Sequence, residues 1–526
     1  MSKNKAVNFG LVVGALSLAQ FIMTVDTTIM NVSIPTLVSD LNTTVGSVQA
    51  AISLYALIMA AFMLLGSKLG EIYGRKKMFQ IGLVIYGIGS AITAIAPSVG
   101  VLIFGWSILE GIGASLMMPA MMALISINFS GKQRVSALSI VAGVAGAAAA
   151  VGPIIGGALS TYASWRYAFV AEVFIAIITL LMSKYIIDNA KLKNEKIDYP
   201  GTTLAASGLA LFVFGVLQAK EFGWIRASKP FEIFGFEFAP FGLSIVPFLC
   251  GVGIALLFGF FYIEKRRKSE GKSVLLDVSL FRNIPLKTGL NVVLITQLSL
   301  GGVMFVMPLF LQLVLGFSAI LTGTVMLPIS IALVLASIFT TKASARFGLI
   351  KTIRASQLIL VVSLFLLAFQ VTNETGAGEL FVPFALFGAA VGFIIPLNQS
   401  ILLGSVKSKD SSQVAGLNYT FQQLGMSLGT AVIGSVLLFS LGSGIVEGLS
   451  ASPSFDQADV QKNSITISSN VEFLSNEQLN EALQESDLSP EQQADVLAIN
   501  SDARLRALRV AIIVAMIMAL LALQSS

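Results

Sequence analysis

The chain has 526 residues, of which 55% are hydrophobic and only 12% charged, and its mean hydropathy is +0.85. This composition excludes an ordinary soluble globular protein. The absence of histidine excludes histidine proton relays and histidine metal sites, and the single cysteine, Cys250, excludes an internal disulfide.

Fourteen apolar spans follow one another along the chain. Each is long enough to cross a bilayer as a helix of about 20 residues, and backbone polar groups must be satisfied within lipid, so we expect helices rather than barrel strands. The spans cover residues 9–35, 49–70, 78–96, 100–127, 136–160, 165–187, 200–219, 241–263, 286–313, 320–341, 353–372, 380–405, 412–440 and 506–523. The sequence therefore predicts an all-α membrane protein.

The distribution of basic residues predicts the orientation of these spans. Most of the 33 lysines and arginines fall in alternate connections, beginning with the N-terminal segment. Because basic residues collect on the cytoplasmic side, we expect both termini to be cytoplasmic. The net charge of +5 is then explained by topology, which excludes a nucleic-acid partner.

The first span carries one acid, Asp26, in the segment DTTIMN (residues 26–31). A carboxylate within hydrocarbon is costly, and such residues commonly mark ion or substrate pathways. We therefore interpret Asp26 as a group that exchanges protons for a substrate.

Two further acids lie within membrane spans, Glu110 in the fourth and Glu172 in the sixth. At 1.5 Å per residue, Asp26, Glu110 and Glu172 all fall roughly 10–15 Å below the outer surface. Burial and mutual repulsion would favour their protonated forms, which suits proton exchange. The alternative for Glu110 and Glu172 is a protonated acid that hydrogen-bonds a neighbouring helix.

Two glycine-containing segments stand out between these acids. In SKLGEIYGRKK (residues 67–77), Glu71 precedes a turn at Gly74 and a basic run that begins at Arg75, so we expect a charge latch that gates the cytoplasmic side. The alternative is ordinary positive-inside anchoring.

In the fifth span, small residues and a proline predict close helix packing and a kink. The motif residues of this span are Gly143, Gly152, Pro153 and Gly157.

Polar residues in the spans are candidates for the walls of a substrate cavity. They are Asn31, Gln297, Gln312, Asn398, Asn418 and Gln422. The alternative is that they form hydrogen bonds between helices.

The one long outward connection, residues 441–503, is acidic and contains a single lysine. Helical periodicity over residues 475–500 predicts a small helical hairpin or a partly disordered flap. It could attract cationic solutes or could simply be a charged, solvated loop. Three arginines lie at the outer end of the last span, where the positive-inside rule does not predict basic residues. They are Arg504, Arg506 and Arg509. We expect them to pair with the acidic loop or with lipid phosphates.

Several of these segments resemble signatures of the major facilitator superfamily. Residues 67–77 are similar to its cytoplasmic-loop signature Gly-x-Leu-Ala-Asp-Arg-x-Gly-Arg-Lys, with Ser67, Glu71 and Ile72 at the first glycine, the aspartate and the first arginine. Residues 143–157 resemble its antiporter signature Gly-(x8)-Gly-Pro-(x3)-Gly. That resemblance implies export by exchange.

Other segments resemble the fourteen-helix drug:H+ antiporters within the superfamily. These are DTTIMNVSIP (residues 26–35), SWRYAF (residues 164–169) and DYPG (residues 198–201). In residues 103–114, Ser107 stands where the family has an arginine linked to proton coupling, and Glu110 stands at the following glutamine. Glu172 stands at the family's asparagine. The two added acids suggest a replacement for the missing arginine.

The resemblance implies a major-facilitator fold with fourteen transmembrane helices. Two pseudo-symmetric six-helix bundles, 1–187 and 286–526, would flank a cytoplasmic linker and two inserted helices in 188–285. We expect proton-coupled efflux of lipophilic, cationic drugs or toxic compounds by alternating access, by a monomer in the plasma membrane. The expected partners are a small-molecule substrate, protons and the lipid bilayer, with no cofactor and no metal.

The alternatives are an exporter of an anionic or lipid-like metabolite, an importer, or a membrane receptor or enzyme. An enzyme would need a nucleophile–base or metal constellation, which the sequence does not offer. A receptor would need a larger soluble domain than residues 441–503 can provide.

Overall fold

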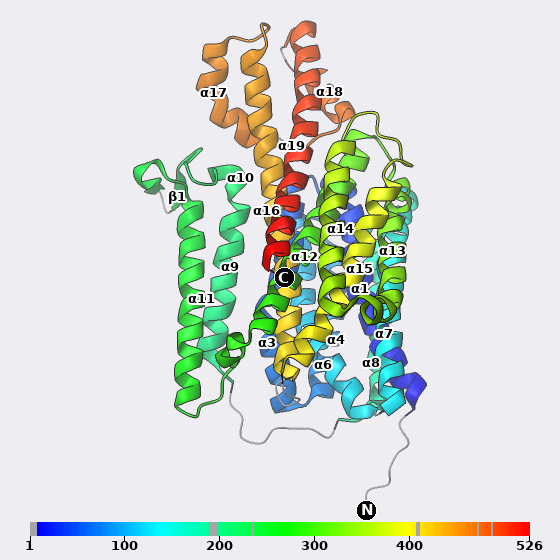
Figure 1. Ribbon diagram of the computed structural model, residues 1–526. Coiled ribbons are helices and arrows are strands. Elements are labelled where there is room, and N and C mark those ends of the chain that lie inside the picture. The colour runs from blue at the N-terminus through cyan, green and yellow to red at the C-terminus, as the bar shows by residue number, and fades with distance from the viewer. Residues whose placement is uncertain are drawn as a thin grey trace, which may run out of the picture.

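The computed structural model describes residues 8–129, 131–188, 197–233, 236–406, 411–470, 473–484, 486 and 488–525. Within these residues, 14 helices are long and apolar enough to cross a membrane, which confirms the predicted number (Figure 1). The strands of the described part are β1 (Phe231–Ile233) and β2 (Phe236–Phe238), which pair antiparallel.

The first half of the chain forms six membrane-length helical segments. They are built from α1 (Phe9–Val32), α2 (Ile34–Asp40), α3 (Val45–Tyr73), α4 (Arg75–Ala94), α5 (Val99–Leu102), the π-helix η1 (Ile103–Glu110), α6 (Gly111–Asn128), α7 (Gly131–Tyr162), α8 (Arg166–Met182) and η2 (Ser183–Tyr185). The fourth segment is continuous from α5 through η1 to α6, and its central π-helix has one residue more per turn than sequence periodicity would suggest.

The second half forms six more membrane-length segments. They are α12 (Ile284–Leu309) with η5 (Phe310–Val314), α13 (Ala319–Phe347), α14 (Leu349–Gln370), α15 (Phe381–Gly404), α16 (Ser411–Ala451) and α19 (Pro490–Ser525). We call the end of the bundle at which α3 joins α4 the basic end, and the opposite end, which carries α17 (Gln457–Asn470) and α18 (Asn476–Gln484), the hairpin end (bottom and top of Figure 1).

The remaining helices lie between the halves in sequence. They are α9 (Tyr199–Leu217), α10 (Ala219–Phe222), η3 (Pro240–Gly242), α11 (Ile245–Ser269) and η4 (Val278–Arg282). The two long ones stand at one side of the bundle, where α9 packs on α3 and α16, and α11 packs on α9 (Figure 1).

Two of the sequence motifs connect neighbouring elements through hydrogen bonds and ion pairs. Asp198 of the DYPG segment caps α9 through the Gly201 N–H and pairs with Arg267 of α11 at 3.1 Å. At the start of α8, Trp165 Nε1 and Arg166 Nη1 both donate to Asp40, each at 3.0 Å. These motifs therefore explain how the inserted helices and α2 are held in place.

The two halves meet along two pairs of helices, α3 with α16 and α7 with α13. At the hairpin end the contact includes hydrogen bonds: Gln312 donates to the Val32 carbonyl at 2.8 Å, and the Ile320 N–H donates to Thr161 Oγ1 at 3.3 Å. The hairpin end is therefore closed by direct contacts between the halves.

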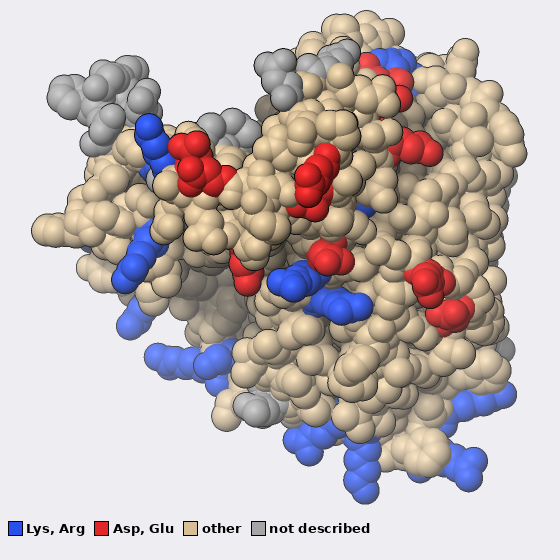
Figure 2. All heavy atoms as spheres, turned by 90° about the horizontal axis from the view of Figure 1, so that it is seen from above, with Lys and Arg blue, Asp and Glu red and all other residues tan. Residues whose placement is uncertain are grey.

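The helices that flank the acidic connection extend well beyond the predicted spans. α16 continues to Ala451 and α19 begins at Pro490, and both project past the bundle with α17 beside them (Figure 1). The helical periodicity predicted over residues 475–500 is confirmed by α18 and by the polar start of α19. The continuation of α16 beyond residue 440 was not predicted, because hydropathy marks only the part of a helix that lies in lipid. Figure 2, which views this end, shows acidic side chains spread over the face rather than gathered into one patch. That distribution favours the interpretation as a solvated surface.

The three arginines at the start of the last span have structural partners. Arg504 is buried and donates to the carbonyls of Leu313 and Leu474 and to Asn476 Oδ1. Arg506 lies 4.0 Å from Glu447, and Arg509 donates to the Val371 carbonyl. Pairing with the acidic connection thus accounts for Arg506 and, through Leu474 and Asn476, for Arg504, whereas Arg509 binds the backbone of Val371.

Candidate functional site

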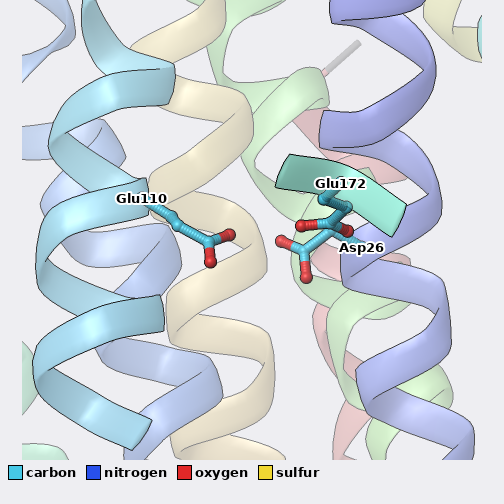
Figure 3. Close-up of side chains that lie close together, drawn as sticks. All are labelled: Asp26, Glu110 and Glu172. Atoms are coloured by element: carbon cyan, nitrogen blue, oxygen red, sulfur yellow. The ribbon is translucent and has the colours of Figure 1, made fainter. Parts of the chain in front are cut away.

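Three membrane helices bring Asp26, Glu110 and Glu172 together (Figure 3). Asp26 comes from α1, Glu110 from the last position of η1 and Glu172 from α8. One carboxylate oxygen of each lies within 4.8 Å of those of the other two, and all three side chains are buried. In Figure 3, Glu110 points from one side toward Asp26 and Glu172, which lie next to each other. We call these three residues the carboxylate cluster.

Asp26 is held by an aromatic residue that sequence reasoning missed. Trp106 Nε1 donates to Asp26 Oδ1 at 2.9 Å and to Oδ2 at 2.8 Å. The indole is stacked on Tyr55 of α3, with ring centroids 5.0 Å apart and planes 8° from parallel. Trp106 directly precedes Ser107, the position that lacks the family's arginine, and this was the one signal in the sequence that could have pointed to it.

Ser107 does not take over the role of the missing arginine. Its Oγ donates to the Ala51 carbonyl at 2.8 Å and so ties η1 to α3. The π-helical turn of η1 instead presents Trp106 to Asp26 and Glu110 to the cluster. The side chain that donates to Asp26 is therefore the neutral indole of Trp106, and Ser107 bonds to α3 instead.

The other two acids differ in their hydrogen bonding. Glu172 Oε2 accepts from Ser90 Oγ at 3.2 Å and from Tyr86 OH at 3.4 Å, both on α4. Neither oxygen of Glu110 has a hydrogen-bond partner among the described residues. Glu110 is packed against Gly89, where a Cβ would lie 2.6 Å from its Cγ. The alternative predicted for Glu172, a hydrogen bond to a neighbouring helix, describes its geometry well.

This arrangement can store protons. Three carboxylates this close cannot all be ionised in a water-poor site, because each charge would be desolvated and repelled by the others. The donors recorded to the cluster, Trp106, Tyr86 and Ser90, are all neutral. The oxygens could also serve as ligands of a hard cation, but Ca2+ takes six to eight oxygens, and three acids supply only part of such a shell.

A cavity of about 240 Å³ lies between the two halves. Its described lining has no charged side chain. The lining residues are Gln20, Met23, Thr24, Thr27, Thr28, Asn31, Met59, Met118, Ala149, Pro153, Gln297, Leu300, Met304, Met326, Ile329, Ser330, Leu333, Gln423 and Met426. A small adjoining pocket of about 20 Å³ shares Thr27 and Asn31 with it and reaches Tyr55 and Trp106. Trp106 thus contacts the carboxylate cluster through Asp26 and also lines the small pocket that adjoins the cavity.

The predicted polar wall residues are distributed between the cavity and other places. Asn31 and Gln297 line the cavity, and the neighbour of Gln422, Gln423, lines it as well. Gln312 bonds to Val32 at the hairpin end, and Asn398 donates to the Gly289 carbonyl at 2.8 Å within the second half. Asn418 is buried outside the described lining of the cavity.

The motif of α7 packs this helix against both halves. A Cβ at Gly152 would collide with Thr28 of α1, and one at Gly157 would lie 2.5 Å from the Ala319 carbonyl oxygen of α13. Pro153 lines the cavity. Gly143, in contrast, has nothing within 4 Å of its Cβ position.

The predicted cytoplasmic latch lies at the junction of α3 and α4. Gly74 has φ 104°, which an L-residue would rarely adopt, and it ends α3 and begins α4. Glu71 pairs with Lys68 of its own helix at 3.6 Å, and Arg75 packs its Cγ near Gly70. The latch role of Glu71 and Arg75 stays a prediction.

Comparison with known proteins places this geometry in context. Residues 16–430 match the family model for the Major Facilitator Superfamily. The chain is 29% identical over 82% of its length to the "Probable actinorhodin transporter" of Streptomyces coelicolor, covering 72% of that protein. It is 25% identical to the multidrug efflux pump LfrA of Mycolicibacterium smegmatis, covering 80% of this chain and 79% of the pump.

Solved structures show the same fold. A bacterial homolog of the human lysosomal transporter Spinster, in an inward-facing and unoccupied conformation, superposes with a TM-score of 0.57 at 13% identity, covering 100% of this chain and 98% of the other. A D-xylose–proton symporter superposes with a TM-score of 0.56 at 13% identity, covering 87% and 94%.

Proposed function

This chain belongs to the Major Facilitator Superfamily, and we propose that it exports lipophilic small molecules across the plasma membrane in exchange for protons. The names of its relatives, an actinorhodin transporter and a multidrug efflux pump among them, support export of drug-like compounds. The observation that carries the proposal is the buried carboxylate cluster, whose Asp26 is bonded by Trp106, a residue that also lines the small pocket adjoining the uncharged cavity.

In this mechanism the cluster and the cavity communicate through Trp106. When Asp26 is ionised, both of its oxygens accept from the indole N–H. A substrate that fills the small pocket beside Tyr55 and Trp106 would disturb this bond, and the cluster would then change its proton content. Proton binding and substrate binding are thereby coupled without direct contact between them.

The chemistry of the cavity favours cations over anions. An anionic substrate would need a lysine or arginine to offset the cost of its desolvation, and the described lining contains neither. The acids behind Trp106 attract positive charge instead. An exporter of an anionic or lipid-like metabolite is therefore the second candidate.

The remaining features follow from the same proposal. The basic end faces the cytoplasm, with both termini on that side, and the hairpin end faces outward. The bundles of residues 1–187 and 286–526 rock about the cavity of a single subunit. The structure, closed at the hairpin end, then corresponds to an inward-facing state.

The proposal is tested in everted membrane vesicles with an imposed proton gradient. A panel of lipophilic cations, neutral compounds and anions is added, and collapse of the gradient is followed with a pH-sensitive dye. Cations should collapse it, and Asp26→Asn should abolish the effect while still reaching the membrane in normal amount. If no compound collapses the gradient, proton exchange is excluded; if anions alone do so, the second candidate is correct.

A further inference from the structure

Methionine is the most frequent apolar residue in the described lining of the cavity. Six helices, α1, α3, α6, α12, α13 and α16, each contribute one methionine to the wall. They are Met23, Met59, Met118, Met304, Met326 and Met426. Three come from each half of the chain, so a bound molecule would meet thioethers on both sides.

A methionine wall differs from a leucine wall of equal volume. The thioether sulfur is polarisable and makes favourable contacts with aromatic rings, often at the ring edge, each contributing about 0.3–1.5 kcal/mol. The described lining of the cavity contains no phenylalanine, tyrosine or tryptophan. Affinity for an aromatic molecule would therefore come from sulfur contacts rather than from stacking on protein rings.

The polar part of the wall offers acceptors that have no donor. Asn31 Nδ2 donates to the Thr27 carbonyl at 2.7 Å, which fixes the orientation of the amide and leaves its Oδ1 buried and without a partner among the described residues. Gln297 Oε1 is also buried and without a partner. Both residues line the cavity. A buried acceptor is costly when unsatisfied, so a ligand that brings an O–H or N–H is favoured.

We propose that the cavity selects planar, fused-ring aromatic compounds that carry a hydroxyl or N–H donor. This inference rests on the proposed function only in treating the cavity as the substrate site. Methionines from both halves contact the ring system, and Asn31 and Gln297 accept from its donor group. Saturated compounds of the same shape lose the sulfur contacts, and compounds without a donor leave the amide oxygens unsatisfied.

Three matched probes separate these contributions. They are 2-hydroxyanthracene, its fully hydrogenated alcohol, which loses aromaticity together with planarity, and its methyl ether, which loses the O–H donor. Binding to the purified transporter in nanodiscs is measured by equilibrium dialysis, with empty nanodiscs as the blank. The phenol should bind roughly tenfold more tightly than either analogue. Equal binding of all three, or no binding of the phenol, overturns the proposal.

A pair of double variants tests the role of sulfur. Met118→Leu with Met304→Leu removes two cavity thioethers at nearly constant volume. The matched control, Met121→Leu with Met307→Leu, changes buried methionines one turn away on the same two helices, outside the described lining. The cavity variant should lose roughly five- to tenfold affinity for the phenol and none for the hydrogenated alcohol, whereas the control should keep both.

The outcome of these binding measurements does not depend on whether the protein transports the probes. If the cavity variant binds the phenol as the wild type does, or loses both probes equally, aromatic selection by sulfur is wrong even where vesicle exchange succeeds. If vesicle exchange fails while the probes discriminate as expected, the proposed function is wrong and the ligand class stands.

Discussion

At the scale of single residues, the contact that matters most is the one between Trp106 and Asp26. The sequence placed Asp26, Glu110 and Glu172 at one depth, and the structure brings their oxygens within 4.8 Å. The same reasoning did not find Trp106, because its place next to Ser107 does not show that its N–H faces an acid. The π-helical turn of η1 that directs it there is equally invisible to residue periodicity.

Trp106→Phe keeps an aromatic ring against Tyr55 but removes the indole N–H that donates to both carboxylate oxygens of Asp26. A hydrogen bond to a charged group contributes about 1.5–3 kcal/mol, so substrate-driven proton flux in proteoliposomes should fall roughly 10- to 100-fold. Trp224→Phe, in the segment outside the bundle, is the control and should leave the flux unchanged. A Trp106→Phe transporter that exchanges at the wild-type rate would show that the indole N–H has no part in coupling.

At the scale of elements, α7 joins the two halves through its glycines. Gly157 lies against the Ala319 carbonyl of α13, and Gly152 lies against Thr28 of α1, two residues from Asp26. The motif that resembles the antiporter signature therefore packs beside the acid and at the closed hairpin end. The sequence predicted close packing here, but not which partner each glycine meets.

Gly157→Ala should destabilise the transporter, because its new methyl group meets a backbone oxygen that cannot move aside. Overpacking of this kind costs about 1–3 kcal/mol, so we expect a lower thermal unfolding temperature in detergent and reduced transport. Gly143→Ala, in the same motif but facing open space, should keep both, since alanine is about 1 kcal/mol better than glycine in a helix. Equal losses in the two variants would refute the packing account.

The lengths of the elements show what hydropathy can and cannot predict. The membrane spans were found because lipid demands about 20 apolar residues. The continuation of α16 to Ala451, which is rich in glycine and serine, and the polar start of α19 at Pro490 both lie outside the predicted apolar spans. Among the polar wall candidates, Asn31 and Gln297 line the cavity while Gln312 and Asn398 bond other helices, and only the fold decides between these uses.

At the scale of the whole molecule, the proposed alternation must act on the contacts between the halves. The bonds of Gln312 to Val32 and of Ile320 to Thr161 close the hairpin end, and both would have to break for a substrate to leave on that side. The cavity and the carboxylate cluster lie between this closed end and the basic end. Export therefore needs the hairpin end to open.

A disulfide across the closed end tests this motion. Thr161→Cys with Ile320→Cys, in a Cys250→Ser background, places thiols on α7 and α13 where the Ile320 N–H donates to the Thr161 side chain. Oxidation should block transport and a reductant should restore it, as measured in proteoliposomes. Undiminished transport by fully cross-linked protein would contradict alternating access at this end.

The central claim is that substrate binding changes the proton content of the carboxylate cluster, and it is tested most directly by proton release. A substrate found in the vesicle panel is added to purified transporter in weakly buffered detergent solution, and the pH is followed with an indicator dye. The account predicts that wild-type protein releases protons as it binds substrate and that Asp26→Asn binds substrate but releases none. Substrate binding to the wild type without proton release, or the same release from Asp26→Asn, would contradict it.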